Sequence, residues 1–342
     1  MTDLQGQPHS PPPPARVMQM ICGYWVTQSI HVAAELRIPD LIAAGTGKLD
    51  DLATVTGAHP GALARLLRAL ESLELLARQS DGRYQLTPLG ECLREGVPNS
   101  MRNLALLAGE EHYRIWAHLD HSVRTGEPAL ERALGAPLWA YLETHPEAAV
   151  RFNNAMSDLA RNVHLAAVAA YDFSTVKKVV DVGGGTGSLL AHVLATHDHL
   201  TGVLFDLPRV VAKAGPVLEQ AGVQDRCEVV GGDFFAGGVP TDGDVYLMSL
   251  VLHDFDDEQS VRILKSVREA IPDHGKLVIL EQVVPADGKP HISKLVDVNM
   301  LVVSGGRERT EAEFAQLLNS AGFRFESTLP SPTTINAIVG TP

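Results

Sequence analysis

A glycine-rich loop constrains the fold of this chain more than any other feature. In the segment VVDVGGGTGSLLAHVL, Gly183, Gly184, Gly185 and Gly187 stand between a short apolar run and a helical one. Glycines at such a place permit a tight turn and let a ligand lie directly against the backbone. Dinucleotide enzymes use the same device, and a purely structural turn can also need glycine. The loop therefore predicts a strand–loop–helix unit and leaves its ligand open.

Short apolar runs with turn residues at their ends recur after this loop. The runs are KKVVDVGGG, LTGVLFDLP, CEVVGGDFF, DVYLMSLVL and KLVILEQVV, and amphipathic stretches such as DEQSVRILKSVREAI separate them. Strands that alternate with helices form a mostly parallel sheet covered on both faces. We therefore expect an α/β, Rossmann-like domain over residues 106–342.

The segment 16–105 is predicted to be mostly helical. A short helix closes at Gly57, a second helix follows, and Asp81-Gly82 between extended runs signals a hairpin. The leucines of the second helix recur at helical spacing and give one buried stripe: Leu63, Leu66, Leu67, Leu70 and Leu73. This is the order of a winged helix. A DNA-reading helix needs a basic face, which only Arg65 and Arg68 offer, so a structural or dimerising domain is favoured over a DNA-binding one.

Composition narrows the class of partner. The formal net charge of the 342 residues is −13, which disfavours nucleic acid and anionic membranes as main partners. The 3 cysteines lack the spacing of a zinc site or a disulfide framework, so a cytoplasmic protein is expected. No apolar stretch is long enough to span a bilayer. Residues 1–15, with Pro11–Pro14, are expected to form a flexible tail.

Acidic residues follow the second and third strand-like runs. Asp206 ends the second run, where a carboxylate can accept hydrogen bonds from ribose hydroxyls. Asp233 and Phe234 end the third, where they can meet the amino group and the face of adenine. Both NAD and S-adenosylmethionine carry adenosine. However, DVGGGTG is not the GxGxxG spacing that suits a pyrophosphate, which favours S-adenosylmethionine.

Candidate catalytic side chains lie at the ends of the fourth and fifth runs, which we expect at the same edge of the sheet. His253 and Asp254 follow the fourth run, Glu281 lies at the end of the fifth, and Glu308 lies in GGRERT. A sulfonium is already a good methyl donor, so the missing component is a nucleophile. A phenol with a pKa of about 10 is mostly neutral at pH 7, and a histidine with a pKa of about 6.5 can take its proton. A glutamate on the other ring nitrogen would fix the tautomer.

Two other interpretations of this segment stay open. His253, Asp254, Asp256 and Asp257 could hold a metal ion, although consecutive acids after a strand more often cap the next helix. His253 could also be structural. The scheme of sulfonium and general base requires no metal.

Five ordered motifs resemble one family across nearly the whole chain. VVDVGGGTG, FDLPRVV, GDFF, LHDFDDE and GGRERT are similar to the class I small-molecule O-methyltransferases, both plant caffeate-type enzymes and bacterial enzymes of antibiotic biosynthesis. The resemblance implies S-adenosylmethionine as cofactor, a hydroxylated aromatic acceptor, a homodimer and an N-terminal dimerisation domain. Some relatives hydroxylate, decarboxylate or steer a pericyclic reaction instead, so methyl transfer is an expectation.

The resemblance also implies roles for individual residues. His253 is expected to be the general base, flanked by Glu281 and Glu308. Expected cofactor contacts are Ser157, Gly183, Asp206, Asp233, Phe234 and Ser249, the last standing where plant enzymes carry lysine. Expected substrate contacts are Met156, Asp254, Asp297 and Met300.

Overall fold

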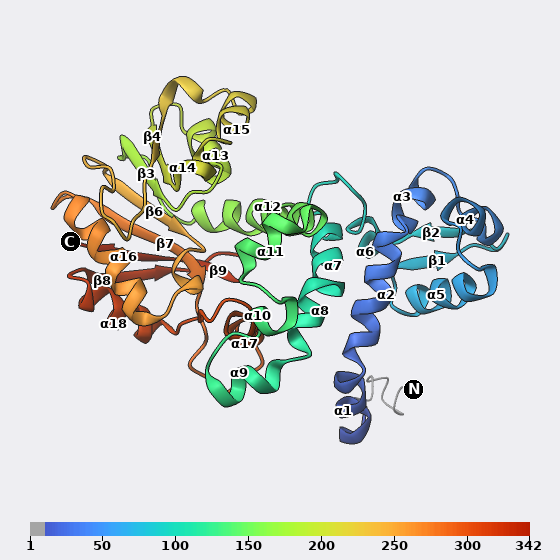
Figure 1. Cartoon of the computed structure of the whole chain (residues 1–342). Coiled ribbons are helices and arrows are strands. Elements are labelled where there is room, and N and C mark those ends of the chain that lie inside the picture. The colour runs from blue at the N-terminus through green and yellow to red at the C-terminus, as the bar shows by residue number, and fades with distance from the viewer. Residues whose placement is uncertain (1–10) are drawn as a thin grey trace, which may run out of the picture. The chain divides into compact units, whose positions relative to one another are not determined.

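A computed structural model describes residues 11–342, apart from the side chains of Trp139, Ser157 and residues 159–165 (Figure 1). The chain divides into two compact units, one of residues 1–113 and 145–158 and one of residues 114–144 and 159–342. The predicted tail, residues 1–15, falls partly outside the described residues. Its last part is helical, because helix α1 begins at Pro13.

The first unit has the predicted order of helix, turn, helix and hairpin. The short helix ends at Gly57, whose φ of 69° is left-handed, and Leu63, Leu67 and Leu70 are buried in a shared core. Gly82 makes the hairpin turn with a φ of 83°. The elements are α1 (Pro13–Ile21), α2 (Gly23–Glu35), α3 (Ile38–Ala43), α4 (Leu49–Thr56), α5 (Pro60–Ser72), β1 (Leu76–Arg78), β2 (Tyr84–Leu86), α6 (Pro88–Glu91) and α7 (Arg102–Gly109). Helix α8 (Glu111–Trp116) begins in the first unit and ends in the second.

The first unit extends beyond residue 105 and takes in the beginning of α12 (Pro146–Val168). Glu111 is buried, and its carboxylate accepts hydrogen bonds from Arg151 Nε at 3.2 Å and Nη2 at 2.5 Å. Asn103 donates to Asp158 at 2.8 Å. A buried carboxylate needs a partner of opposite charge. This ion pair joins two segments that are far apart in the sequence, which strand and helix patterns do not reveal.

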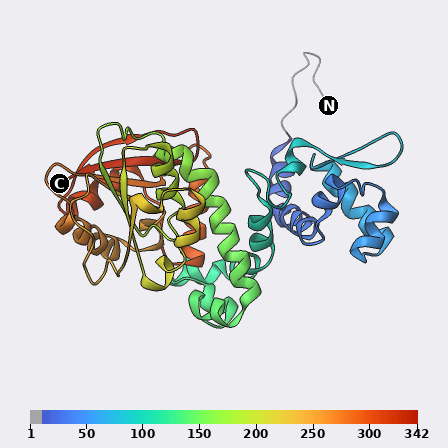
Figure 2. The ribbon, with the colours of Figure 1, turned by 90° about the horizontal axis from the view of Figure 1, so that it is seen from above.

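The second unit is the expected Rossmann-like domain (Figures 1 and 2). Its seven-stranded sheet has the order β5-β4-β3-β6-β7-β9-β8. The five strands from β5 to β7 run parallel, whereas β9 pairs antiparallel with both β7 and β8. The strands are β3 (Lys178–Val182), β4 (Thr201–Asp206), β5 (Cys227–Gly231), β6 (Val245–Ser249), β7 (Lys276–Gln282), β8 (Arg324–Leu329) and β9 (Ile335–Thr341).

Successive residues of the strands bury themselves on opposite faces of the sheet, as the pleat requires. On one face, Val179 and Leu247 pack against α13 and α15. On the other, Val180 and Met248 pack against α16 and α18. The helices that contribute to these layers or connect them are α13 (Ser188–Thr196), α14 (Pro208–Val211), α15 (Gly215–Gln220), α16 (Asp257–Ala270) and α18 (Glu311–Ser320), with single turns η1 (Gln224–Arg226) and η2 (Leu252–Asp254).

A separate small core joins the remaining helices of this unit. Ile115, Leu130 and Val302 are buried together, and the indole of Trp116 donates to Asn299 at 2.9 Å. The helices are α9 (Leu119–Thr125), α10 (Leu130–Leu134), α11 (Leu138–Thr144) and α17 (Ser293–Val303). Among the described residues, no helix combines the length and the apolar character that crossing a membrane requires.

Candidate active site

The glycine loop leaves β3 at the carboxyl edge of the sheet and leads into α13. Gly183, Gly185 and Gly187 have φ values of 73°, 63° and 82°, in the left-handed region that favours glycine. A Cβ on Gly183 would lie 2.8 Å from a methyl of Val251 and 3.7 Å from the ring of Phe234. The loop therefore packs directly against the segments that follow β5 and β6.

Asp206, the last residue of β4, lies against this loop. Its Oδ2 accepts the N–H of Gly185 at 2.8 Å and its Oδ1 accepts the N–H of Leu207 at 2.6 Å. Burial raises the pKa of this carboxyl, and the two hydrogen bonds partly offset the rise. The carboxylate is thus fixed beside the glycines, with further lone pairs that can accept from a ligand.

The segment after β5 adds an acid and an aromatic ring. Asp233 is exposed, and Phe234 packs edge-on against Phe235 and Phe255, with ring centroids 5.0 Å and 6.0 Å away. The N–H of Gly232 donates to the backbone carbonyl of Asp206 at 2.9 Å, which joins this segment to β4. Two carboxylates, an aromatic ring and an open glycine loop fit the ribose and adenine of S-adenosylmethionine.

Asp181 is a residue that the sequence analysis missed. It is 1% exposed, and neither carboxylate oxygen has a hydrogen-bond partner among the described residues. Burial and the nearby charge of Asp206 raise its pKa to about 7. A Cβ on Gly184 would lie 2.5 Å from its Oδ2. The available signal was a lone acid inside an apolar strand, directly before the glycines.

His253 lies on the single turn η2 rather than on the strand itself, because β6 ends at Ser249 and Leu250 adopts a positive φ of 50°. The carboxylate of Glu281, on β7, binds the backbone N–H groups of this turn. Its Oε1 accepts the N–H groups of Val251, Leu252 and His253 at 3.0, 2.9 and 3.3 Å. The fully buried carboxylate therefore fixes three consecutive peptide groups of the turn.

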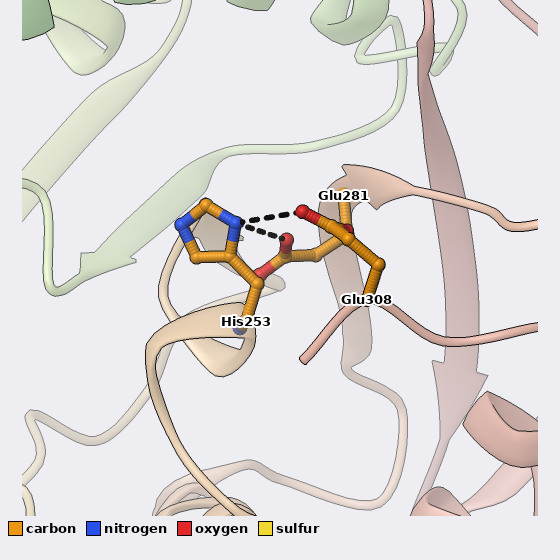
Figure 3. A group of neighbouring side chains, drawn as sticks. All are labelled: His253, Glu281 and Glu308. Carbon is orange, nitrogen blue, oxygen red and sulfur yellow. Dashed lines mark hydrogen bonds and ion pairs between the residues drawn. The ribbon is translucent and has the colours of Figure 1, made fainter. Parts of the chain in front are cut away.

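The imidazole of His253 points one nitrogen at two glutamates (Figure 3). Nδ1 lies 3.2 Å from Oε1 of Glu308 and 3.7 Å from Oε2 of Glu281, and both carboxylates are buried. A carboxylate accepts a hydrogen bond and cannot donate one, so this arrangement places a proton on Nδ1. In the neutral ring, Nε2 then carries the free lone pair. Asp254, 53% exposed, has its Oδ1 3.8 Å from Nε2.

The surrounding charges change how readily His253 is protonated. Burial alone lowers the pKa of the imidazole, but Glu281, Glu308 and Asp254 outweigh it and raise the pKa to about 9. Burial raises the pKa of Glu281 to about 7, against the opposing charge of His253. His253 is therefore a stronger base than the ordinary histidine assumed from the sequence.

Helix α17 holds the backbone of Glu308 through a hydrogen bond. Oδ1 of Asp297 accepts the backbone N–H of Glu308 at 2.9 Å. Met300 is half-buried on the same helix. Both were expected to contact substrate, and that role remains a prediction. Met156 is exposed on the part of α12 that belongs to the first unit, and the side chain of Ser157 lies outside the described residues.

The acids after His253 have structural partners, as expected for a helix cap. Asp256 accepts the N–H of Gln259 in a capping box at the start of α16, and Asp257 pairs with Arg307 and Arg309. A different set, His253, Glu281 and Glu308, has ligand atoms within 4.8 Å of one another and could hold a metal ion. The sulfonium chemistry described above does not require one.

Known proteins resemble this chain over almost its full length. A family model for the O-methyltransferase domain matches residues 116–324, and one for the O-methyltransferase dimerisation domain matches residues 18–96. The phenazine O-methyltransferase of Lysobacter antibioticus is 46% identical over 326 residues, covering 95% of each protein. The solved structure of LaPhzM aligns with a TM-score of 0.89 and 45% identity, covering 97% of this chain and 100% of that one.

Two further relatives differ in chemistry or carry ligands. An O-methyltransferase of neocarzinostatin biosynthesis, solved with S-adenosyl-L-homocysteine and 1,4-dihydroxy-2-naphthoic acid, has a TM-score of 0.78 and 34% identity, covering 92% of this chain and 95% of that one. The phenazine-1-carboxylate N-methyltransferase of Pseudomonas aeruginosa is 31% identical and covers 94% of this chain and 96% of its own length.

Proposed function

This chain belongs to the S-adenosylmethionine-dependent O-methyltransferases, and on that premise we propose that it methylates a hydroxyl of a small aromatic molecule, with His253 as general base and without a metal ion. One observation carries the proposal. The two buried glutamates at Nδ1 leave Nε2 of His253 as the proton acceptor of the neutral ring.

When bound, S-adenosylmethionine supplies an electrophilic methyl group whose leaving group, a neutral thioether, needs no proton. The chain has to supply a nucleophile. Nε2 of His253 takes the hydroxyl proton as the oxygen attacks, while Glu308 and Glu281 stabilise the imidazolium. A pKa of about 9 for His253 lies closer to the pKa of about 10 of a phenol than that of an ordinary histidine, so the proton transfer is less uphill.

The relatives favour a planar aromatic acceptor, because one is a phenazine O-methyltransferase and another was solved in complex with 1,4-dihydroxy-2-naphthoic acid. A second candidate is methyl transfer to nitrogen, which the N-methyltransferase of Pseudomonas aeruginosa favours. The protein should be incubated with S-adenosylmethionine and a panel of hydroxyphenazines, hydroxynaphthoates and matched aminoarenes. Mass spectrometry of the products then locates the methyl group. Products methylated only on nitrogen, or transformed without a methyl group, would overturn the proposal.

We expect S-adenosylhomocysteine to raise the melting temperature, because it binds the folded chain. Asp206→Ala should lose most of this rise, since it removes the carboxylate that lies against the glycine loop. Differential scanning fluorimetry and calorimetric titration check the result. Asp225→Ala is the matched control, because this exposed acid lies in η1, at the amino end of β5. Unchanged affinity in Asp206→Ala would show that the site lies elsewhere.

We expect a homodimer formed through the first unit. Met20, Ile21 and Trp25 of α1 and α2 are 71%, 67% and 59% exposed, which is unusual for large apolar side chains on a single chain. Light scattering at micromolar concentration should give twice the 36.7 kDa mass of the chain, and Met20→Asp combined with Ile21→Asp should reduce it. A mass equal to that of one chain for the unmodified protein would contradict the dimer.

A further inference from the structure

Arg309 is a buried cation next to the site with no role in the chemistry described so far. It is 1% exposed. Its Nη1 donates to the carbonyl of Leu252 at 3.0 Å, its Nη2 donates to the carbonyl of Phe255 at 3.0 Å and to Ser260 Oγ at 3.1 Å, and its Nε donates to Asp257 at 2.9 Å. Two of these four partners are peptide carbonyls that flank His253 in the chain.

We propose that Arg309 is a positioning residue for methyl transfer, whose guanidinium fixes the carbonyl side of the turn that carries His253. The proposal rests on the proposed function of His253 as the general base. Arg309 does not contact the imidazole. It would act through the backbone that sets the place of Nε2.

The contacts of the turn divide between two buried groups of opposite charge. Glu281 accepts the N–H groups of residues 251–253, and Arg309 donates to the carbonyls of residues 252 and 255. The carbonyl of His253 itself accepts the N–H of Arg307 at 2.9 Å. Hydrogen bonds therefore fix both the N–H groups and the carbonyl groups of the turn.

The shape of the side chain explains why an arginine lies here. A planar guanidinium presents its donors in a rigid fork, whereas a lysine ammonium is a single point charge. The fork reaches two carbonyls, a hydroxyl and a carboxylate from one position. A buried charge is expensive unless it is fully hydrogen-bonded, and these four partners provide the compensation.

Arg309→Lys should keep the charge but lose the fork, so that the turn shifts. A misplacement of about 1 Å costs on the order of 10²-fold in rate, and a partial shift should cost on the order of 10-fold in kcat. The KM for S-adenosylmethionine and the affinity for S-adenosylhomocysteine should each change by less than about threefold, because the substitution does not touch the glycine loop. The assay uses an acceptor identified in the substrate panel.

The pH dependence separates positioning from general loss of structure. As the pH approaches the pKa of the acceptor hydroxyl, the hydroxyl ionises without help from His253. The ratio of the wild-type rate to the Arg309→Lys rate should therefore fall. Groups that face the imidazole, Glu281, Glu308 and Asp254, are the same in both proteins. A merely destabilised protein would show the same ratio at every pH. Such a constant ratio would overturn the proposal.

Arg226→Lys is the matched control. Arg226 also donates to three carbonyls, those of Leu194, His197 and Leu200, but it lies at the amino end of β5. This variant should lower the melting temperature and leave kcat and its pH dependence unchanged.

Two further measurements cover the case in which Arg309→Lys does not fold. Ser260→Ala removes one partner of Arg309 and should show a smaller loss of kcat with the same pH trend. Nitrogen-15 spectra of histidine-labelled protein report the imidazole directly, and the His253 signals are assigned as those missing from His253→Ala. The Nδ1 resonance of His253 should shift in Ser260→Ala and stay unchanged in Arg226→Lys. An unshifted resonance in Ser260→Ala would refute positioning. Full activity of His253→Ala would instead refute the base.

Discussion

His253→Ala is expected to lower kcat by about 10²–10⁴-fold at neutral pH, the usual effect of losing a positioned base. The affinity for S-adenosylhomocysteine should stay within about twofold, because the glycine loop and Asp206 do not depend on the imidazole. Stopped assays of product formation and calorimetric titration measure the two quantities. Wild-type turnover in the variant would exclude His253 as the base.

The pH profile of the unmodified protein gives a second measure of the same residue. Protonated imidazole cannot accept a proton, and the neighbouring glutamates raise its pKa to about 9. The value of kcat/KM, which reports the free protein, should therefore fall as the pH drops below about 9, rather than below the ordinary value of about 6.5. In His253→Ala the rate should instead follow ionisation of the acceptor hydroxyl. A profile that is flat from pH 6 to 9 would contradict the proposed role.

Three comparisons sharpen this experiment. His274→Ala removes an exposed histidine, 71% accessible, that pairs with Asp244 away from the site, and should leave activity unchanged. Glu281→Gln should lose less than His253→Ala, because its carbonyl oxygen can still accept the three N–H groups of the turn. A chelator should have no effect. Loss of activity on chelation and recovery with magnesium would favour a metal ion held by His253, Glu281 and Glu308.

Gly306→Ala should reduce kcat by on the order of 10²-fold, because it forces the turn of His253 to move. A Cβ on Gly306 would lie 1.9 Å from the carbonyl oxygen of His253 and 2.8 Å from Cα of Asp254. Both atoms belong to the backbone, so no side-chain rotation relieves the overlap. Steady-state kinetics measure the loss, and fluorimetry with S-adenosylhomocysteine checks that the cofactor site remains.

Gly288→Ala provides the control for an added methyl group in the loop between β7 and α17, because nothing lies within 4 Å of its Cβ position. It should retain full activity. If Gly306→Ala were equally active, the packing of this loop on the turn would not matter for the reaction.

Local patterns in the sequence were sufficient for the parallel part of the sheet. The glycine loop, Asp206 and the alternating apolar runs each depend on residues close together in the chain, and the sheet has its predicted parallel part. The antiparallel pairing of β9 with β7 requires contacts that no local pattern encodes. The same holds for the ion pair of Glu111 with Arg151, which joins α8 to α12 within the first unit.

The residues of the site were predicted only in part, because some follow from local motifs and others depend on contacts between distant segments. His253, Glu281 and Glu308 could be named from strand ends and motifs, and the structure brings them together. The pKa of His253 could not, because it depends on the distances to three carboxylates and on burial. Arg309 and Asp181 escaped notice, since an arginine or aspartate in a sequence is usually exposed. Only the fold shows that both are buried.

The small core of α9, α10 and α17 has a consequence for how such enzymes diversify. It is built from its own apolar residues, apart from the two layers that flank the sheet. The glycine loop follows β3 and Glu281 lies on β7, whereas the backbone of Glu308 is bonded to Asp297 of α17. Substitutions among the apolar residues of this core can therefore change its packing while the two layers on the sheet stay intact, provided that Asp297 keeps its bond to Glu308. This part of the second unit can in this way vary independently of the sheet that carries the glycine loop and Glu281.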